Sequence, residues 1–154
     1  MSAKPTPTKW KQKVLIVEDN EPTRKLMVKY FLKARENKHL NCEVFEAADG
    51  KEAIAILNKN LPDVILADIN MPVMDGFKFL EYFRKSYLKK HPFSFFCFLS
   101  GSVEEKKDAF RKGAMGFIAK DEMNYYVFTL QLKAWLRMVF LERTLEIKRA
   151  LHIF

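Results

Sequence analysis

The chain has 154 residues, of which 49% are hydrophobic and 30% are charged, and its 27 basic and 19 acidic side chains give a net charge of +8 at pH 7. This length and composition suit one buried core with appended segments. No apolar stretch reaches the ~20 residues that span a bilayer, and the N-terminus has no apolar signal region, so a cytoplasmic protein without a membrane span is expected.

The chain begins with a segment, residues 1–12, that is rich in Lys, Thr and Pro and is predicted to be a flexible basic tail. Short apolar runs then alternate with segments of helical periodicity. Strands are predicted at 13–17, 42–47, 63–67, 95–99 and 116–119, and helices at 22–36, 51–57, 76–88 and 103–112. This alternation predicts an α/β fold with a parallel sheet that is covered on both faces.

The first predicted helix shows the pattern most clearly. Pro22 suits a first helical turn. Apolar residues follow at helical spacing: Leu26, Met27, Tyr30, Phe31 and Ala34.

A long final helix is predicted over residues 125–154, because the segment from 123 onward contains no Gly or Pro. It carries two apolar stripes. The first, expected to close the core, contains Phe128, Leu132, Trp135 and Val139. The second, expected to bind a partner or a second copy of the chain, contains Leu130, Ala134, Met138, Leu141 and Leu145. The alternatives are a helix that breaks near Arg143 and folds back, and a linker to a further domain.

The cysteines and histidines show no metal-ligand spacing. Cys42 and Cys97 lie in predicted strands and are expected to be buried and reduced. His39, His91 and His152 are scattered along the chain and are expected on the surface or in loops.

Five polar side chains come directly after predicted strands: Glu18, Asp19, Asp68, Ser100 and Lys120. In an open parallel sheet, ligands bind at the carboxyl ends of the strands, so these side chains are expected to share one pocket. Three carboxylates together resist ionisation unless a cation neutralises them, and Mg²⁺ prefers oxygen ligands. Asp68 can act as a nucleophile toward phosphorus, with the ammonium and the hydroxyl available to the phosphoryl oxygens. Each residue alone could equally be a helix cap, a turn residue or a surface charge, and their joint spacing favours the pocket.

The segments VLIVEDN, EAADGKEAI, PDVILADINMPVMDG, FLSGS and GAMGFIAK resemble, in order and spacing, the receiver domain of two-component response regulators. The resemblance runs from about Lys13 to Lys120 and implies a domain at 13–124. It implies a CheY-like, flavodoxin-like, doubly wound five-stranded parallel sheet, a (βα)5 three-layer sandwich, here with an extended final helix.

The resemblance also implies roles for individual residues. Asp68 would be the phosphoacceptor, Lys120 its ammonium partner, and Ser100 the switch hydroxyl. Mg²⁺ or Mn²⁺ would be held by a set of oxygen ligands: Glu18, Asp19, Asp68 and the backbone carbonyl of Asn70. Asn70 and Ser102 would tune the lifetime of the phosphate. The family's partners are histidine kinases and histidine phosphotransfer proteins.

Three positions depart from the family pattern. Phe117 stands where a switching tyrosine is common, so an aromatic switch keeps its ring but lacks a hydroxyl. Asp121 stands where the family usually has proline, and it is expected to cap the final helix; the alternative is that its charge weakens phosphate binding. Gly101 replaces the more usual alanine and loosens its loop.

The leading hypothesis is a phosphorylation switch that loses its phosphate unaided and is not a turnover enzyme. A turnover phosphatase would need a second acid where Asn70 stands. The alternatives are a phosphorylation-independent binding or dimerisation module, and the N-terminal piece of a longer response regulator. The basic excess is attributed to solvated helix faces, and specific nucleic-acid binding is not expected.

Overall fold

A computed structural model describes residues 11–151 of the chain, and most of the predicted tail at 1–12 therefore lies outside the described residues. The first strand, β1, spans Gln12–Val17, so it begins one residue before the predicted strand and includes the last residue of the predicted tail. The other strands are β2 (Cys42–Ala47), β3 (Val64–Asp68), β4 (Phe95–Ser100) and β5 (Gly116–Ala119). All neighbours pair in parallel in the order β2-β1-β3-β4-β5. The predicted doubly wound five-stranded sheet is confirmed.

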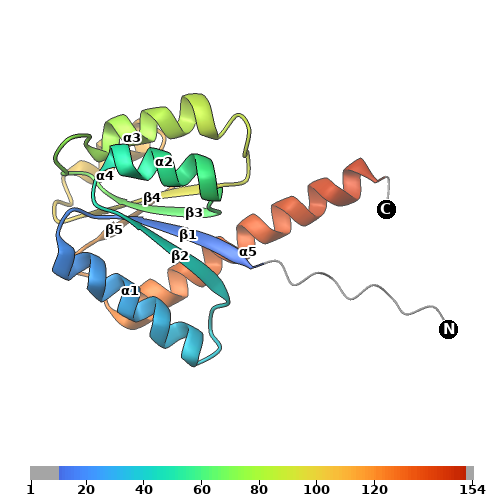
Figure 1. Ribbon diagram of the computed structural model, residues 1–154, viewed down its shortest axis with the longest axis horizontal. Coiled ribbons are helices and arrows are strands. Elements are labelled where there is room, and N and C mark those ends of the chain that lie inside the picture. The colour runs from blue at the N-terminus through green and yellow to red at the C-terminus, as the bar shows by residue number, and fades with distance from the viewer. Residues whose placement is uncertain (1–10, 152–154) are drawn as a thin grey trace.

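Helices cover both faces of this sheet and give three layers (Figure 1). One face is covered by α1 (Glu21–Glu36) and α5 (Tyr125–Ala150). The opposite face is covered by α2 (Gly50–Asn60), α3 (Gly76–Tyr82), the π-helical turn η1 (Phe83–Tyr87) and α4 (Glu105–Arg111). Two separate hydrophobic clusters fill the two interfaces, as expected for a sheet with both faces buried.

The start and buried face of α1 largely follow the predicted pattern. Asn20 caps the helix by accepting a hydrogen bond from the Thr23 N–H, and Pro22 lies in the first turn. The buried residues are Met27, Phe31 and Ala34. Leu26 shares the helical spacing but is 41% exposed. Leu26 lies one residue from Met27, about 100° around the helix, so it lies at the edge of the buried face.

The segment predicted as one helix over 76–88 changes its winding halfway. The α-helical part ends at Tyr82 and η1 continues the chain to Tyr87. The buried rings of Phe83 and Tyr87 pack 5.7 Å apart, so this turn still contributes to the core. Periodicity indicated the helical segment without revealing the wider turn.

The final helix is continuous through Arg143, which contradicts a break at that point. Of the first stripe, Phe128, Leu132 and Val139 are buried, whereas Trp135 is half-buried and stacks on Phe95 with ring centroids 5.0 Å apart. The core face also contains Thr129 and Leu136, which the predicted stripe left out. The predicted second stripe is exposed throughout.

The middle of α5 is tied to the sheet by a buried carboxylate. Asp63 lies just before β3, and its Oδ2 accepts a hydrogen bond of 2.8 Å from the Lys13 N–H. Its Oδ1 lies 2.7 Å from Nη1 of Arg143, and the Asp63 side chain is 2% exposed. This ion pair fixes α5 beyond the last buried apolar residue, Val139, and leaves the turns after it free of the sheet (Figure 1).

Both cysteines are buried, free thiols, as predicted. Burial raises the pKa of the Cys42 thiol to about 11 and that of Cys97 well above its ordinary value. His91 packs against Tyr87 with the two rings tilted and their centroids 4.6 Å apart, and His152 lies outside the described residues. Among residues 11–151, no helix has both the length and the apolar character that crossing a membrane requires.

Candidate functional site

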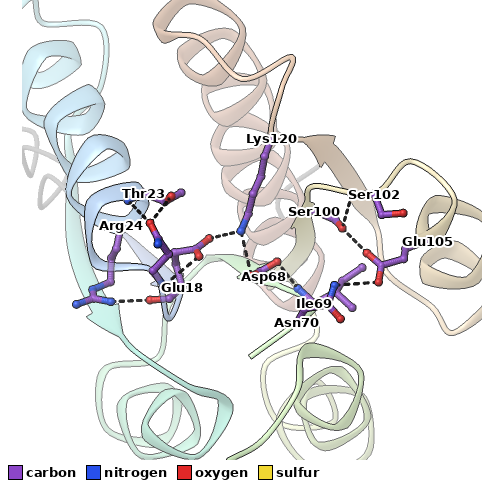
Figure 2. A network of polar contacts seen from close by, with 11 residues as sticks. Glu18, Thr23, Arg24, Asp68, Ile69, Asn70, Ser100, Ser102, Glu105 and Lys120 are labelled. Atoms are coloured by element: carbon purple, nitrogen blue, oxygen red, sulfur yellow. Dashed lines mark hydrogen bonds and ion pairs between the residues drawn. The ribbon is translucent and has the colours of Figure 1, made fainter. Parts of the chain in front are cut away.

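The carboxyl ends of four strands bring the predicted polar residues together, as Figure 2 shows. Glu18 follows β1, and its N–H donates to the Ala47 carbonyl at 3.0 Å, so it continues the sheet by one residue. Asp68 and Ser100 are the last residues of β3 and β4. Lys120 follows β5, and its N–H donates to the Ser100 carbonyl at 2.8 Å. Regular backbone pairing therefore fixes all four residues at one edge.

The Lys120 ammonium lies between two carboxylates. Its Nζ is 2.7 Å from Oε2 of Glu18 and 3.0 Å from Oδ2 of Asp68. The Glu18 side chain is fully buried and the Asp68 side chain is 8% exposed, whereas Lys120 keeps 23% of its side-chain surface. One cation thus faces two largely buried anions, and the ammonium is the member of the trio that is most open to solvent.

Backbone groups hold the two carboxylates in place. Oδ1 of Asp68 accepts a hydrogen bond of 2.8 Å from the Ile69 N–H, and Oε1 of Glu18 accepts one of 3.2 Å from the Asn20 N–H. Arg24 donates from Nη1 to the Glu18 carbonyl at 2.6 Å. These contacts leave Oδ2 of Asp68 directed at Lys120 (Figure 2).

A glycine makes room behind Asp68. Asp75 caps α3 by accepting from the Lys78 N–H, and the Gly76 N–H donates to the Ile69 carbonyl at 2.8 Å. A Cβ added at Gly76 would lie 2.2 Å from the backbone oxygen of Asp68. These contacts give Asp75 and Gly76 a structural role at the turn before α3, and Gly76 also sets how closely α3 approaches Asp68.

Burial and charge act on the three groups in opposite directions. Burial raises the pKa of Glu18, which the nearby Asp68 charge also raises, while Lys120 lowers it. Burial likewise raises the pKa of Asp68 against the lowering effect of Lys120. Burial by itself lowers the pKa of Lys120, but the two carboxylates outweigh it, so that this pKa is raised. The site therefore has an excess of negative charge that one ammonium does not fully compensate.

The same edge offers a place for a cation. Glu18, Asp19 and Asp68 each present a carboxylate oxygen, and these oxygens lie within 4.8 Å of one another. Oε2 of Glu18 is buried and accepts no aligned hydrogen bond, although the Lys120 ammonium is close. Asp19 is exposed and brings a third carboxylate from the solvent side. A group of hard oxygen ligands with unmet negative charge fits Mg²⁺.

Sequence reasoning missed one residue of this edge, Glu105. Its Oε1 accepts a hydrogen bond of 3.0 Å from Nδ2 of Asn70, and its Oε2 accepts one from the Ser100 hydroxyl (Figure 2). Ser100 Oγ in turn accepts from the Ser102 N–H at 3.1 Å. In the sequence, Glu105 is one acidic residue of a predicted helix start, which is common on solvated helices. The available signal was its place five residues after Ser100, near the start of the helix predicted to follow that loop.

Two of the departures from the family pattern have defined surroundings. Asp121 does not cap the final helix: Asn124 does, by accepting hydrogen bonds from the Tyr126 and Val127 N–H groups at 3.0 and 3.1 Å. An Asn placed directly before the first helical residue is well suited to this role, whereas Asp121 lies too early. Phe117 is half-buried and packs against the cluster under α2, α3 and α4.

A hollow of about 840 Å³ lies elsewhere, along α3 and η1, and is lined by basic and apolar side chains together with Asp75 and Glu81. It contains none of the carboxylates that surround Lys120. Size alone therefore does not identify the chemical site, which is recognised by its convergent charged groups.

Comparisons with known proteins agree with this geometry. A family model described as the response regulator receiver domain matches residues 14–126. The structure resembles the chemotaxis response regulator CheY4 of Vibrio cholerae, with 31% identity, a TM-score of 0.70, and coverage of 82% of this chain and 99% of that one. It also resembles a putative response regulator from Chloroflexus aurantiacus, with 26% identity, a TM-score of 0.71, and coverage of 83% and 99%.

Similar sequences include parts of much longer proteins. A protein-glutamate methylesterase/protein-glutamine glutaminase of Methanococcoides burtonii is 34% identical over 112 residues, which are 70% of this chain and 29% of the relative. Histidine kinase P4 of Formosa agariphila is 30% identical over 125 residues, 81% of this chain and 8% of the kinase. The chain thus spans less than a third of the length of these two relatives.

Proposed function

Because this chain belongs to the response regulator receiver family of two-component systems, we propose that it is a signalling switch in which Asp68 accepts a phosphoryl group from a phosphohistidine. The observation that carries the proposal is the Lys120 ammonium, 3.0 Å from Oδ2 of a nearly buried Asp68. An ammonium at this place would neutralise charge on the incoming group, which is what phosphoryl transfer mainly requires.

The transfer step uses the groups at the strand ends. An Asp68 carboxylate oxygen attacks phosphorus while the bond between phosphorus and the donor imidazole nitrogen breaks. The electron pair of that bond goes to the imidazole, which carries a proton on its other ring nitrogen and leaves neutral. Lys120 pairs with the phosphoryl oxygens, and the Ser100 hydroxyl donates a hydrogen bond to one of them.

A divalent cation fits the opposite side of Asp68. Glu18, Asp19 and Asp68 are its expected ligands, with the backbone carbonyl of Asn70 as a further one. When bound, Mg²⁺ or Mn²⁺ would neutralise the carboxylates and the phosphoryl oxygens. The buried Oε2 of Glu18, which has no aligned hydrogen bond, supports this assignment.

The output is a change of surface. Engagement of Ser100 by the phosphoryl group moves the loop after β4, and the half-buried Phe117 ring responds to the space that is vacated. Loss of the phosphate by hydrolysis, at a rate set partly by Asn70 and Ser102, returns the switch to rest. The donor is a histidine kinase or a histidine phosphotransfer protein, which implies a cytoplasmic location. The chain acts only on its own phosphorylation and dephosphorylation.

A second function is favoured by the exposed stripe on α5. Leu130, Met138, Leu141 and Leu145 expose between 38 and 70% of their surface on a helix that continues past its anchor at Arg143. Apolar side chains in such an array favour association, either with a second copy or with a downstream protein. In this second function, association through α5 does not depend on phosphorylation of Asp68.

The test is phosphorylation by acetyl phosphate in the presence of Mg²⁺, followed by intact-mass measurement. We expect one added phosphoryl group on the wild type and none on Asp68→Asn. Asp75→Asn is the matched control, because Asp75 is a loop carboxylate that caps α3 and should leave phosphorylation unchanged. Equal phosphorylation of the wild type and Asp68→Asn would refute the assignment of Asp68, and an unphosphorylated wild type would favour the binding function of α5.

A further inference from the structure

The carboxylate of Glu105 joins two loops that flank the proposed phosphorylation site (Figure 2). One oxygen accepts from the Asn70 side chain, which follows β3, and the other accepts from the Ser100 hydroxyl at the end of β4. Ser100 is fully buried and Glu105 is half-buried, so water has limited access to the bond between them. Glu105 is also the first residue of α4.

The Ser100 hydroxyl has one proton to donate. In this structure the proton goes to Glu105, while the oxygen accepts the Ser102 N–H. A hydroxyl whose proton is held by a carboxylate cannot donate the same proton to a phosphoryl oxygen on Asp68. A hydrogen bond to an ionised group is also about twice as strong as a neutral one, so the carboxylate is an effective competitor.

We propose that Glu105 is a latch: a positioning residue that holds the Ser100 hydroxyl away from the phosphoryl group until phosphorylation breaks the contact. This inference rests on the proposed roles of Asp68 and Ser100. Release of the latch also frees the first turn of α4, because Glu105 is the residue that ties this turn to Ser100 and Asn70. The same hydrogen bond therefore sets the barrier to phosphorylation and transmits the event to α4.

The kinetic test compares Glu105→Ala with the wild type during phosphorylation by acetyl phosphate. In this reaction an Asp68 oxygen bonds to phosphorus, the bond from phosphorus to the acetyl oxygen breaks, and acetate leaves with the electron pair. The loss of one hydrogen bond to a charged group corresponds to roughly ten- to hundredfold in an equilibrium. We expect Glu105→Ala to be phosphorylated about tenfold faster.

Glu104→Ala is the matched control, since Glu104 is an adjacent carboxylate that contacts Ser102 and neither Ser100 nor Asn70. Its rate should stay within about twofold of the wild type, a change too small for the loss of a charged hydrogen bond. Glu105→Gln keeps the shape of the side chain and should be several-fold faster than the wild type; it replaces the alanine variant if that variant does not fold. Equal rates for the wild type and the folded Glu105 variant would overturn the latch.

A double-mutant cycle shows whether Glu105 acts through the hydroxyl. In the Ser100→Ala background there is no proton to release, so the gain from Glu105→Ala should disappear. A full tenfold gain in that background would show that Glu105 acts by its charge alone and would also overturn the latch.

Hydrogen exchange separates failure of the latch from failure of the proposed function. In the unphosphorylated protein, Glu105→Ala should speed exchange of the Ser102 amide and of the first turn of α4 about tenfold relative to Glu104→Ala. If the wild type accepts no phosphoryl group, the proposed function fails. If hydrogen exchange in Glu105→Ala is unchanged, the latch is overturned, whatever the result of the phosphorylation experiment. Faster exchange would support the latch as a structural contact whichever donor is used.

Discussion

Replacement of Gly76 by alanine tests how closely the fold fits around Asp68. The added Cβ would lie 2.2 Å from the Asp68 carbonyl oxygen and 2.9 Å from Cα of Ile69. A carbon atom ordinarily stays about 3.3 Å or more from a carbonyl oxygen, so the start of α3 would have to move by roughly 1 Å. Both of these contacts are with backbone, which cannot rotate away.

The expected cost follows from these contacts. Overpacking in a filled interior costs about 1 to 3 kcal/mol, and the displacement also weakens the hydrogen bond from the Gly76 N–H to Ile69, worth about 1 kcal/mol. The better helix propensity of alanine offsets at most about 1 kcal/mol. Because the last two effects nearly cancel, we expect Gly76→Ala to lower the free energy of unfolding by about 1 to 3 kcal/mol. The added Cβ also pushes on the backbone of Asp68 and Ile69, and a displacement of Asp68 approaching 1 Å should slow phosphorylation on the order of a hundredfold.

Urea unfolding and an intact-mass time course with acetyl phosphate measure the two effects. Gly101→Ala is the control, because a Cβ there meets no atom within 4 Å and the backbone φ is not positive. It should be neutral or stabilising by up to about 1 kcal/mol. A Gly76→Ala protein as stable and as reactive as Gly101→Ala would refute the close approach of α3 to Asp68.

Three further predictions concern α5 and the charged site. Leu132 is fully buried, so Leu132→Ala should lower the free energy of unfolding, measured with urea, by about 2 to 5 kcal/mol. Leu130 is exposed, so Leu130→Ala should change it by no more than about 0.5 kcal/mol. Equal losses would contradict the orientation of α5. Arg143→Ala should lower the free energy of unfolding by about 3 kcal/mol, because it leaves the buried Asp63 carboxylate without its cation. The control, Arg137→Ala on the exposed side of α5, should lower it by less than about 0.5 kcal/mol. Comparable losses for the two variants would show that the ion pair does not anchor α5. Burial raises the pKa of Asp68 in the folded protein, so metal-free wild type should lose stability as the pH rises through the raised pKa. This loss should be smaller in Asp68→Asn, which keeps only the raised pKa of the buried Glu18. Melting curves between about pH 4 and 7 that run parallel for both proteins would contradict the burial of an ionisable Asp68.

The positions of Glu18, Asp68, Ser100 and Lys120 could be predicted because strand ends in a parallel sheet meet at one edge. Each apolar run was short, and the residue after it was polar, so the edge could be located along the chain. The family resemblance then assigned roles to residues that the sheet had already grouped. No tertiary detail was needed for either step.

Glu105 could not be predicted in the same way. Its contacts depend on how the loop at 101–104 places the first turn of α4, and a loop containing Gly101 has many conformations. The cap of α5 was misplaced for a related reason. Asp121 and Asn124 are both good capping residues, and only the path of the chain after Lys120 decides between them.

The two apolar stripes of α5 show which buried residues helical periodicity can predict and which it misses. It separated the buried Leu132 from the exposed Leu130 correctly, but it did not include Leu136, because the helix faces the sheet along a wider band than the chosen stripe. The anchor between Asp63 and Arg143 joins residues 80 positions apart in the chain. A pairing of that kind depends on tertiary structure and leaves no local pattern.

The central claim is that Asp68 receives the phosphoryl group, and identification of the modified residue tests it most directly. After phosphorylation with acetyl phosphate and Mg²⁺, borohydride reduction converts an aspartyl phosphate to homoserine, which fragment masses then locate in the chain. The account predicts homoserine at position 68 and an unmodified Asp19. Homoserine at position 19 or 75, or none in a chain that carries added phosphate, would contradict it.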